Sequence, residues 1–269
     1  MTKIQQQLVA LSQQTNSIMD KINFRNIVKK LPIIAFWLII WQLVAMLIDK
    51  EVLFASPLRV ISCLIDLVKD TDFLRDILYS LYHVLLGFFL ALFISLVLSF
   101  LSIKIPVIYR YLSPLFTLIK STPVAAFILM AFLVFGSQGL STFISFLMAL
   151  PILYTNITDG LLSVPKPMMD AARVYNMQER SIWRYIYLPH SVPFLLSGCS
   201  ISLGLAWKSG IAAEVIGIAR HSLGEHLYDA KLYLDTPQVF AVTLIIVFLS
   251  WACEKVIMYA LNRVCSIIL

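Results

Sequence analysis

Long stretches without a charged residue are the feature of this sequence that most restricts its fold. Three of them, Leu31–Ile48, Val84–Ile103 and Thr236–Cys253, are each long enough to cross the ~30 Å hydrocarbon core of a bilayer as a helix. Only 13% of the residues are charged, compared with about 25% in soluble domains. The sequence therefore predicts an all-α integral membrane protein.

Two further uncharged stretches bring the expected number of transmembrane helices to about six. Ser121–Thr158 is long enough for two spans if the chain turns at the Gly-Ser-Gln-Gly sequence of residues 136–139, and glycine-rich breaks of this kind mark turns. The first of these two spans would begin near Leu115. Ser191–Trp207 supplies the remaining span, which we expect to continue toward Gly217.

The distribution of basic residues predicts the orientation of the chain. If the N-terminus is cytoplasmic, residues 1–30, 104–114, 159–190 and the C-terminal tail are cytoplasmic and contain 12 of the 21 Lys and Arg residues, whereas the outer loops contain 7. Cytoplasmic loops carry the excess of positive charge. We therefore expect both termini on the cytoplasmic side of the plasma membrane, and the net charge of +6 gives no reason to invoke nucleic acid.

Residues 1–30 form a separate N-terminal segment, mostly hydrophilic, in which the apolar residues recur on one helical face (Ile4, Leu8, Leu11, Ile18, Ile22). This spacing predicts an amphipathic helix that lies on the inner membrane surface or packs on the rest of the protein. The four cysteines are scattered, without the spacing of metal ligands.

The stretch from residue 159 to 190, called here the polar segment, interrupts the apolar pattern with charged residues. We expect two short helices, the first with Ser163 as its N-cap and prolines in its first turn. Asn176 should end the first helix, because Asn is the commonest choice after Gly for the left-handed conformation found there. Pro189 should end the second helix before the fifth span.

The polar segment resembles a loop of ATP-binding-cassette (ABC) importer permeases. In that family Glu-Ala-Ala is followed after three residues by Gly, and after nine more by Ile, one residue and Leu-Pro. The same spacing occurs here in Asp170-Ala171-Ala172, Asn176, Ile186 and Leu188-Pro189. Other stretches, such as LSPLFTLIKSTPVAAFILMAFLVFG from Leu112 and AWKSGIAAEVIG from Ala206, are similar to nitrate, sulfonate and taurine permeases, so that the resemblance covers roughly residues 55–260.

The resemblance implies a transport subunit without enzymatic activity, with residues 31–269 as the transmembrane permease domain. The family's loop docks on a cytoplasmic ATPase, which implies a coupling role for Asp170, Ala171, Ala172, Arg173, Asn176, Ile186, Leu188 and Pro189. The implied partners are a second permease copy, two ATPase subunits and an extracytoplasmic substrate-binding protein. No G-x-x-x-x-G-K-[ST] motif occurs, so we expect ATP and Mg²⁺ on the ATPase and no cofactor on this chain. Permeases of this kind carry sulfonates, taurine, nitrate, bicarbonate or thiamine-precursor pyrimidines.

Three residues near the end of the fifth span, Trp207, Lys208 and Glu214, are candidates for the translocation path. Charges near a span usually face water or a partner, although Lys208 could equally extend its ammonium to the outer interface. The small residues Gly198, Ser200, Ser202 and Gly204 suit close helix packing.

Three other hypotheses are weaker. A metal site at His221, Glu225, His226 and Asp229 is less favoured than a surface that contacts a binding protein. A secondary transporter would be expected to show internal repeats and ionisable residues in mid-membrane. An intramembrane serine hydrolase would need G-x-S-x-G, which Gly198–Ser202 approaches but fails at the final glycine.

Overall fold

A computed structural model describes residues 32–50 and 52–268, and these form helices joined by short connections. The predicted N-terminal amphipathic helix lies outside the described residues. After the helix Pro32–Ile48 the elements are α2 (Pro57–Lys69), α3 (Thr71–Lys104), α4 (Pro106–Ser121), α5 (Val124–Phe135), α6 (Leu140–Leu162), α7 (Lys166–Val174), α8 (Glu179–Ile182), the π-helical turn η1 (Trp183–Tyr187), α9 (Leu188–Gly217), α10 (Leu223–Leu232) and α11 (Thr236–Ile268).

Four helices of the described chain are long and apolar enough to cross a membrane, namely α3, α6, the continuous helix from α8 to α9, and α11. The pair α4 and α5 passes the same test as one broken span, and Pro32–Ile48 is a shorter apolar helix. Among the described residues, length and composition therefore support four spans, or five if the bent pair is counted as one span, rather than the six predicted.

The third predicted span is not a single helix, which corrects the prediction. The chain turns sharply at Thr122-Pro123, and α4 and α5 are inclined at 102° to one another. Thr122 has extended backbone angles (φ −83°, ψ 135°), because the residue before a proline is disfavoured in the helical region. Residues 104–114, predicted as a loop, likewise contain only a turn at Ile105 before α4 begins.

The centre of the protein is α6, which packs against α3 on one side and α9 on the other. Glycines permit this close approach. A Cβ added at Gly87 of α3 would lie 2.8 Å from the Cβ of Ser145, and one added at Gly198 of α9 would lie 2.8 Å from the Cβ of Asn156. Gly198 therefore has the predicted packing role, whereas Gly204 has no heavy atom near its added Cβ.

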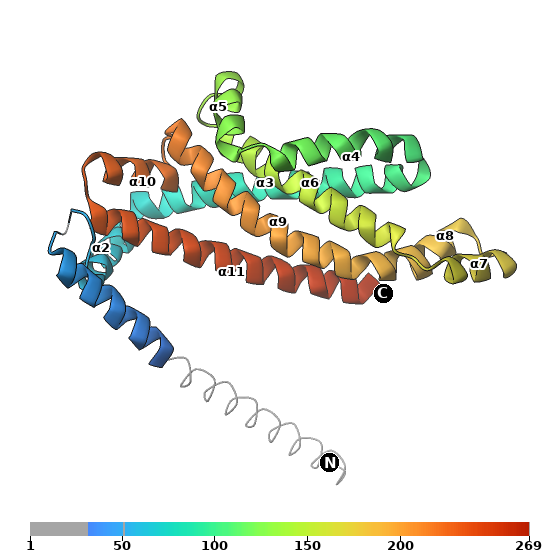
Figure 1. Ribbon diagram of the computed structural model, residues 1–269, viewed down its shortest axis with the longest axis horizontal. Coiled ribbons are helices and arrows are strands. Elements are labelled where there is room, and N and C mark those ends of the chain that lie inside the picture. Colours follow the sequence, from blue (N-terminus) through green and yellow to red (C-terminus); the bar gives the residue numbers. More distant parts are fainter. Residues whose placement is uncertain (1–31, 51, 269) are drawn as a thin grey trace, which may run out of the picture.

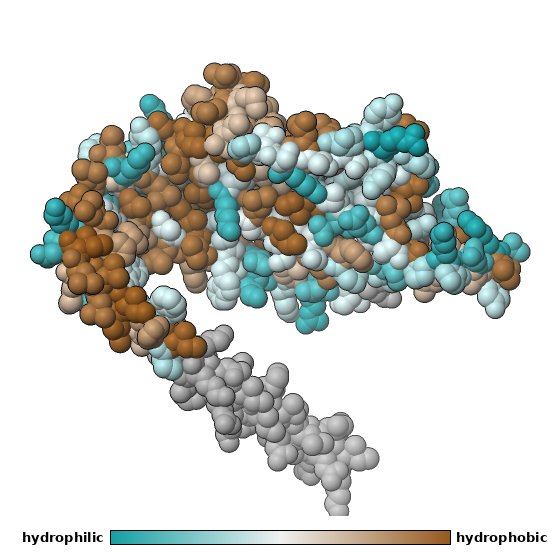
Figure 2. Space-filling model, in the orientation of Figure 1, coloured by the Kyte–Doolittle hydropathy of each residue, from teal (hydrophilic) through white to brown (hydrophobic). Residues whose placement is uncertain are grey.

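The outer surface of the bundle carries many exposed apolar side chains. They gather over the helix Pro32–Ile48 and over α5, whereas polar side chains gather at the end formed by α7 and α8 (Figure 2). This pattern suits lipid contact along the helices and water at the α7–α8 end.

Candidate coupling surface

The polar segment projects beyond the helical bundle at the end where α3 meets α4 (Figure 1). Its first helix, α7, begins at Lys166 with Pro165 as the N-cap. The prediction of Ser163 as this N-cap is wrong. Ser163 is instead the C-cap of α6, and its hydroxyl donates to the carbonyl of Gly160 (2.8 Å). The two-residue difference arises because Pro165, with its fixed φ, takes the extended conformation that the N-cap requires.

Asn176 ends α7 in the predicted left-handed conformation, with φ of 49°. The backbone N–H of Met177 donates to the carbonyl of Ala172 (2.9 Å) and that of Asn176 to the carbonyl of Arg173 (3.0 Å). This pair of hydrogen bonds is the Schellman motif, which satisfies the last carbonyls of a helix.

Substitutions at Asn176 test the importance of this conformation. Asn176→Gly should stabilise the protein by about 0.5 kcal/mol, because Gly adopts positive φ most easily. Asn176→Val should destabilise it by about 1–2 kcal/mol. Thermal unfolding in detergent measures both changes. Gln178→Val is the control, since Gln178 is exposed and has φ of −65°; an equal cost at both positions would contradict the assignment.

The second helix of the polar segment does not end at Pro189, so this prediction is wrong. Glu179–Gly217 is one continuous helix of 39 residues. The π-helical turn η1 widens it just before the proline, and the N–H of Leu188 donates to the carbonyl of Trp183. A wider turn accommodates a residue that lacks an N–H and whose ring would clash in a regular helix. The exposed end of the segment is therefore joined directly to the buried helix α9.

The eight predicted coupling residues divide into two groups. Ala172 and Ile186 are buried, and Leu188 and Pro189 are half-buried; these four attach the segment to the bundle. The other four, Asp170, Ala171, Arg173 and Asn176, are exposed. On this outer face the guanidinium of Arg173 lies 3.4 Å from the carboxylate of Asp170.

Sequence reasoning missed the large apolar side chains that accompany this exposed face. Val174, Tyr175 and Tyr185 are 78%, 80% and 66% exposed. The signal in the sequence was the position of Val174 and Tyr175 between the polar residues Arg173 and Asn176. Exposed apolar residues rimmed by charged ones are typical of a surface that binds another protein.

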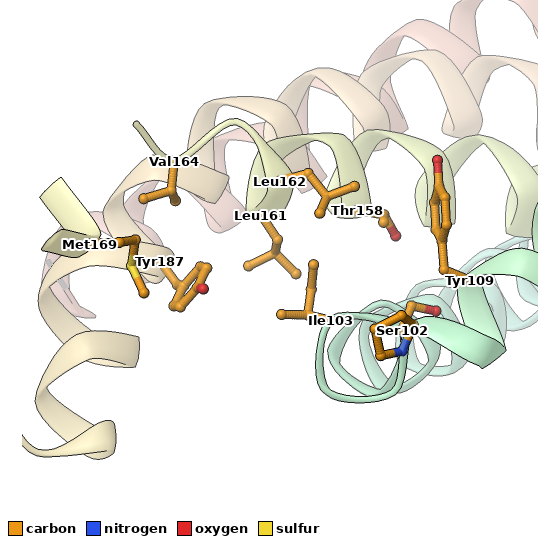
Figure 3. A pocket seen from close by; sticks show the side chains of 10 residues that line it. Ser102, Ile103, Tyr109, Thr158, Leu161, Leu162, Val164, Met169 and Tyr187 are labelled. Atoms are coloured by element: carbon orange, nitrogen blue, oxygen red, sulfur yellow. The ribbon is translucent and has the colours of Figure 1, made fainter. Parts of the chain in front are cut away.

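A cavity of about 350 Å³ lies between the polar segment and the bundle (Figure 3). Met169 of α7 and Tyr187 of η1 face Leu161 of α6 and Ile103 of α3 across it. Nearby, the ring of Trp183 packs on Phe100 with centroids 4.8 Å apart. The polar segment is thus attached to the bundle by the packing of Trp183 on Phe100, and the cavity beside α7 leaves space for this helix to move.

The three candidate path residues lie in different surroundings. Lys208 is exposed on α9, whereas the indole N–H of Trp207 donates to the carbonyl of Ile246 in α11 (3.1 Å). Glu214 is fully buried. Its carboxylate accepts hydrogen bonds from Ser80 of α3 (2.7 Å) and Ser141 of α6 (3.0 Å) and, at 3.3 Å, from the backbone N–H of Gly224 in α10.

Comparison with known proteins identifies the family. Residues 84–264 match the family described as the inner membrane component of binding-protein-dependent transport systems. The chain belongs to this family. The match includes the whole polar segment, the cavity behind it and the three candidate path residues.

Individual relatives agree with this assignment. A probable ABC transporter permease of Brucella melitensis is 29% identical, and the match covers 79% of this chain and 86% of the relative. A nitrate import permease of Leptolyngbya laminosa is 27% identical over 73% of this chain and 74% of its own. A Bacillus subtilis permease named for aliphatic sulfonates is 26% identical over 75% of this chain and 74% of its own.

The fold agrees as well. The inward-facing structure of a methionine ABC transporter superposes with a TM-score of 0.59, at 18% identity, over 74% of this chain and 96% of that chain. The protein is therefore a multi-pass membrane permease of the importer type, a transport subunit rather than an enzyme, and the family implies ATPase and substrate-binding protein partners. The secondary-transporter and hydrolase hypotheses are not supported. Within the sequence Gly198–Ser202, which the hydrolase hypothesis considered, the hydroxyl of Ser200 donates a hydrogen bond to the carboxylate of Glu254 (2.6 Å).

The far end of the permease carries the residues considered as metal ligands. Nε2 of His226 lies 2.8 Å from the carboxylate of Asp76, and Nδ1 of His221 lies 3.8 Å from it. Glu225 accepts a hydrogen bond from the backbone N–H of His221 (2.5 Å). Within the described residues no group of three His, Cys, Asp or Glu side chains could hold a metal ion. These contacts instead join α10 to α3.

Proposed function

We propose that this permease moves a small anionic solute inward and that its polar segment docks on a cytoplasmic ATPase subunit. The observation that carries the proposal is the continuity of the helix Glu179–Gly217. One end of it lies in the exposed polar segment, and the other packs against α6 and α3. A force applied to α8 is therefore transmitted along a single helix to the centre of the bundle.

The docking surface consists of the exposed face of α7 and the start of α8. Asp170 and Arg173 provide charged contacts, and Val174 and Tyr175 provide apolar area. Tyr and Arg are among the residue types that contribute most to binding at protein interfaces. We assign ATP and Mg²⁺ to the ATPase and no cofactor to this chain. We further propose that the polar segment and both termini lie in the cytoplasm, which the distribution of Lys and Arg supports.

A second copy of the permease completes the translocation path. Lys208 lies on an exposed face of α9 together with Ile201, seven residues earlier and hence on the same side of the helix. A charge at this position is costly against lipid but is tolerated beside water or protein. Lys208 then faces the path. Trp207 and Glu214 are buried and hold α9 in place through their hydrogen bonds to α11, α3 and α6.

The transport cycle follows from this geometry. Closure of two ATPase subunits draws the two polar segments together, and each segment tilts its α9 relative to α3. The relatives named for nitrate and aliphatic sulfonates support a small anion as the solute. The family description names a dependence on a binding protein, and we propose that such a protein delivers the solute at the α10 end, which lies opposite the polar segment (Figure 1).

Tyr175→Asp tests the docking surface. We expect at least a tenfold loss of ATPase subunit co-purified with the permease, because the substitution removes a large apolar contact and adds a charge to the interface. Co-purification from detergent, quantified by densitometry, measures the effect.

Tyr233→Asp is the matched control. Tyr233 is 78% exposed, follows the last residue of α10 as Tyr175 follows that of α7, and also precedes a residue with positive φ. It lies at the opposite end of the protein (Figure 1), so ATPase association should remain at the wild-type level. Equal retention of the ATPase by both variants would contradict the proposed docking surface.

A further inference from the structure

A second cavity, of about 420 Å³, lies where the bent pair α4–α5 meets α6 and α9. Its walls are mostly apolar, with Met148, Pro151 and Leu205 among the lining residues. Four polar side chains also line it: Lys120, Thr122, Thr155 and Asn156. Small-molecule sites are typically of this size and combine apolar walls with a few placed polar groups.

Two breaks in regular helix structure create this cavity. The sharp turn at Thr122-Pro123 ends α4 at Lys120–Ser121 and starts α5 at Val124, which lines the cavity. The first N–H groups of a helix have no partner within the helix and form the positive end of its dipole. In α6, Pro151 interrupts the helical hydrogen bonding, and Thr155 donates to its carbonyl (2.8 Å).

Lys120 is the charged group of the cavity. Its ammonium donates to the hydroxyl of Thr155 (3.0 Å). Asp159, one turn further along α6, acts on it electrostatically, but no carboxylate of the described residues is within the 4.0 Å of an ion pair with it. Ionisable residues within membrane spans are uncommon and mark the pathways of ions and substrates.

We propose that this cavity binds the anionic head group of the transported solute, with Lys120 as its charge partner and Asn156 and the start of α5 as neutral hydrogen-bond donors. This inference rests on the proposed function, because it places the solute within the same permease. One lysine suits a singly charged head group, and the apolar walls suit a short organic remainder. The cavity adjoins Ile201 of α9, on the exposed helix face that also carries Lys208, and so opens toward the proposed path.

The test uses methanesulfonate as the probe and dimethyl sulfone as its uncharged counterpart of nearly the same shape. The full-length permease is purified with its ATPase subunits in phospholipid-free detergent, and thermal shifts are titrated with each compound. We expect methanesulfonate to stabilise the wild type and dimethyl sulfone to have little effect. Lys120→Met, which keeps the side-chain length, should weaken methanesulfonate binding at least tenfold.

Lys255→Met is the matched control, since it removes an exposed lysine of α11 that neither lines the cavity nor belongs to the proposed path, and it should bind the probe like the wild type. Equal shifts in the wild type and Lys120→Met would overturn the proposal, because the effect would then be a general effect of salt. A Lys120-dependent shift with added phosphatidylglycerol, but none with methanesulfonate, would also overturn it and identify a lipid head group as the ligand. Neither result would affect the co-purification test with Tyr175→Asp, so failure of this site is distinguishable from failure of the proposed function.

Discussion

Gly224→Ala is expected to destabilise the permease by about 3 kcal/mol. A Cβ added at Gly224 would lie 2.6 Å from both the carbonyl carbon of Glu214 and the backbone nitrogen of Val215. Backbone atoms cannot rotate away as a flexible side chain can, so α10 would have to separate from α9. Separation would also weaken the hydrogen bond from the N–H of Gly224 to the Glu214 carboxylate.

The cost is large because Glu214 holds several helices together. Its carboxylate binds Ser80 of α3 and Ser141 of α6, and the hydroxyl of Ser80 in turn accepts the backbone N–H of Leu223 in α10 (2.9 Å). Groups buried in such a network are costly to leave without partners, at about 1–3 kcal/mol each. Displacing α10 affects all of them together.

Gly204→Ala is the matched control for this prediction. Gly204 lies in the middle of α9, and its added Cβ would meet no heavy atom within 4 Å. The substitution should stabilise the helix by about 0.5–1 kcal/mol, because alanine loses less conformational freedom on folding. Thermal unfolding of both variants in detergent measures the difference, and a Gly224→Ala variant as stable as the wild type would contradict the close contact between α10 and α9.

The parts of the fold that depend on neighbouring residues were predictable from the sequence. Charge-free stretches located the apolar helices, since length and composition alone decide whether a helix can cross a bilayer. The left-handed Asn176 was also predictable, because the conformational preference belongs to that residue type. The sequence could further locate the exposed segment that contains Asp170 and Arg173.

Features that depend on distant residues or on competing local signals were not predictable. Ser80 and Ser141 lie far from Glu214 in the sequence, so nothing in the pattern indicated that the carboxylate is buried and bound to both. Pro123 gave a local signal for the α4–α5 break, but the long charge-free stretch around it suggested an uninterrupted span. Pro189 suggested a helix end, and the π-helical turn that accommodates it has no clear sequence pattern.

Tyr185→Pro is expected to reduce transport at least tenfold while leaving the permease bound to its ATPase. Tyr185 lies in η1, between the docking surface and α9, and its side chain is 66% exposed. Proline within a helix removes a hydrogen bond, clashes with the preceding turn and kinks or breaks the helix, at a cost of about 3 kcal/mol. The kink would absorb the movement of α8 before it reaches α9.

Tyr185→Ala separates this effect from the loss of the side chain. It removes the same exposed ring but favours the helix, and transport should remain within about twofold of the wild type. A twofold change represents a much smaller difference in free energy than the about 1.4 kcal/mol that a tenfold change represents. Both variants are reconstituted into liposomes with the ATPase and substrate-binding protein, and uptake is measured beside ATP hydrolysis. ATP hydrolysis that continues in Tyr185→Pro without uptake indicates uncoupling. Wild-type uptake by Tyr185→Pro would show that the helix Glu179–Gly217 need not be continuous for force to reach the bundle.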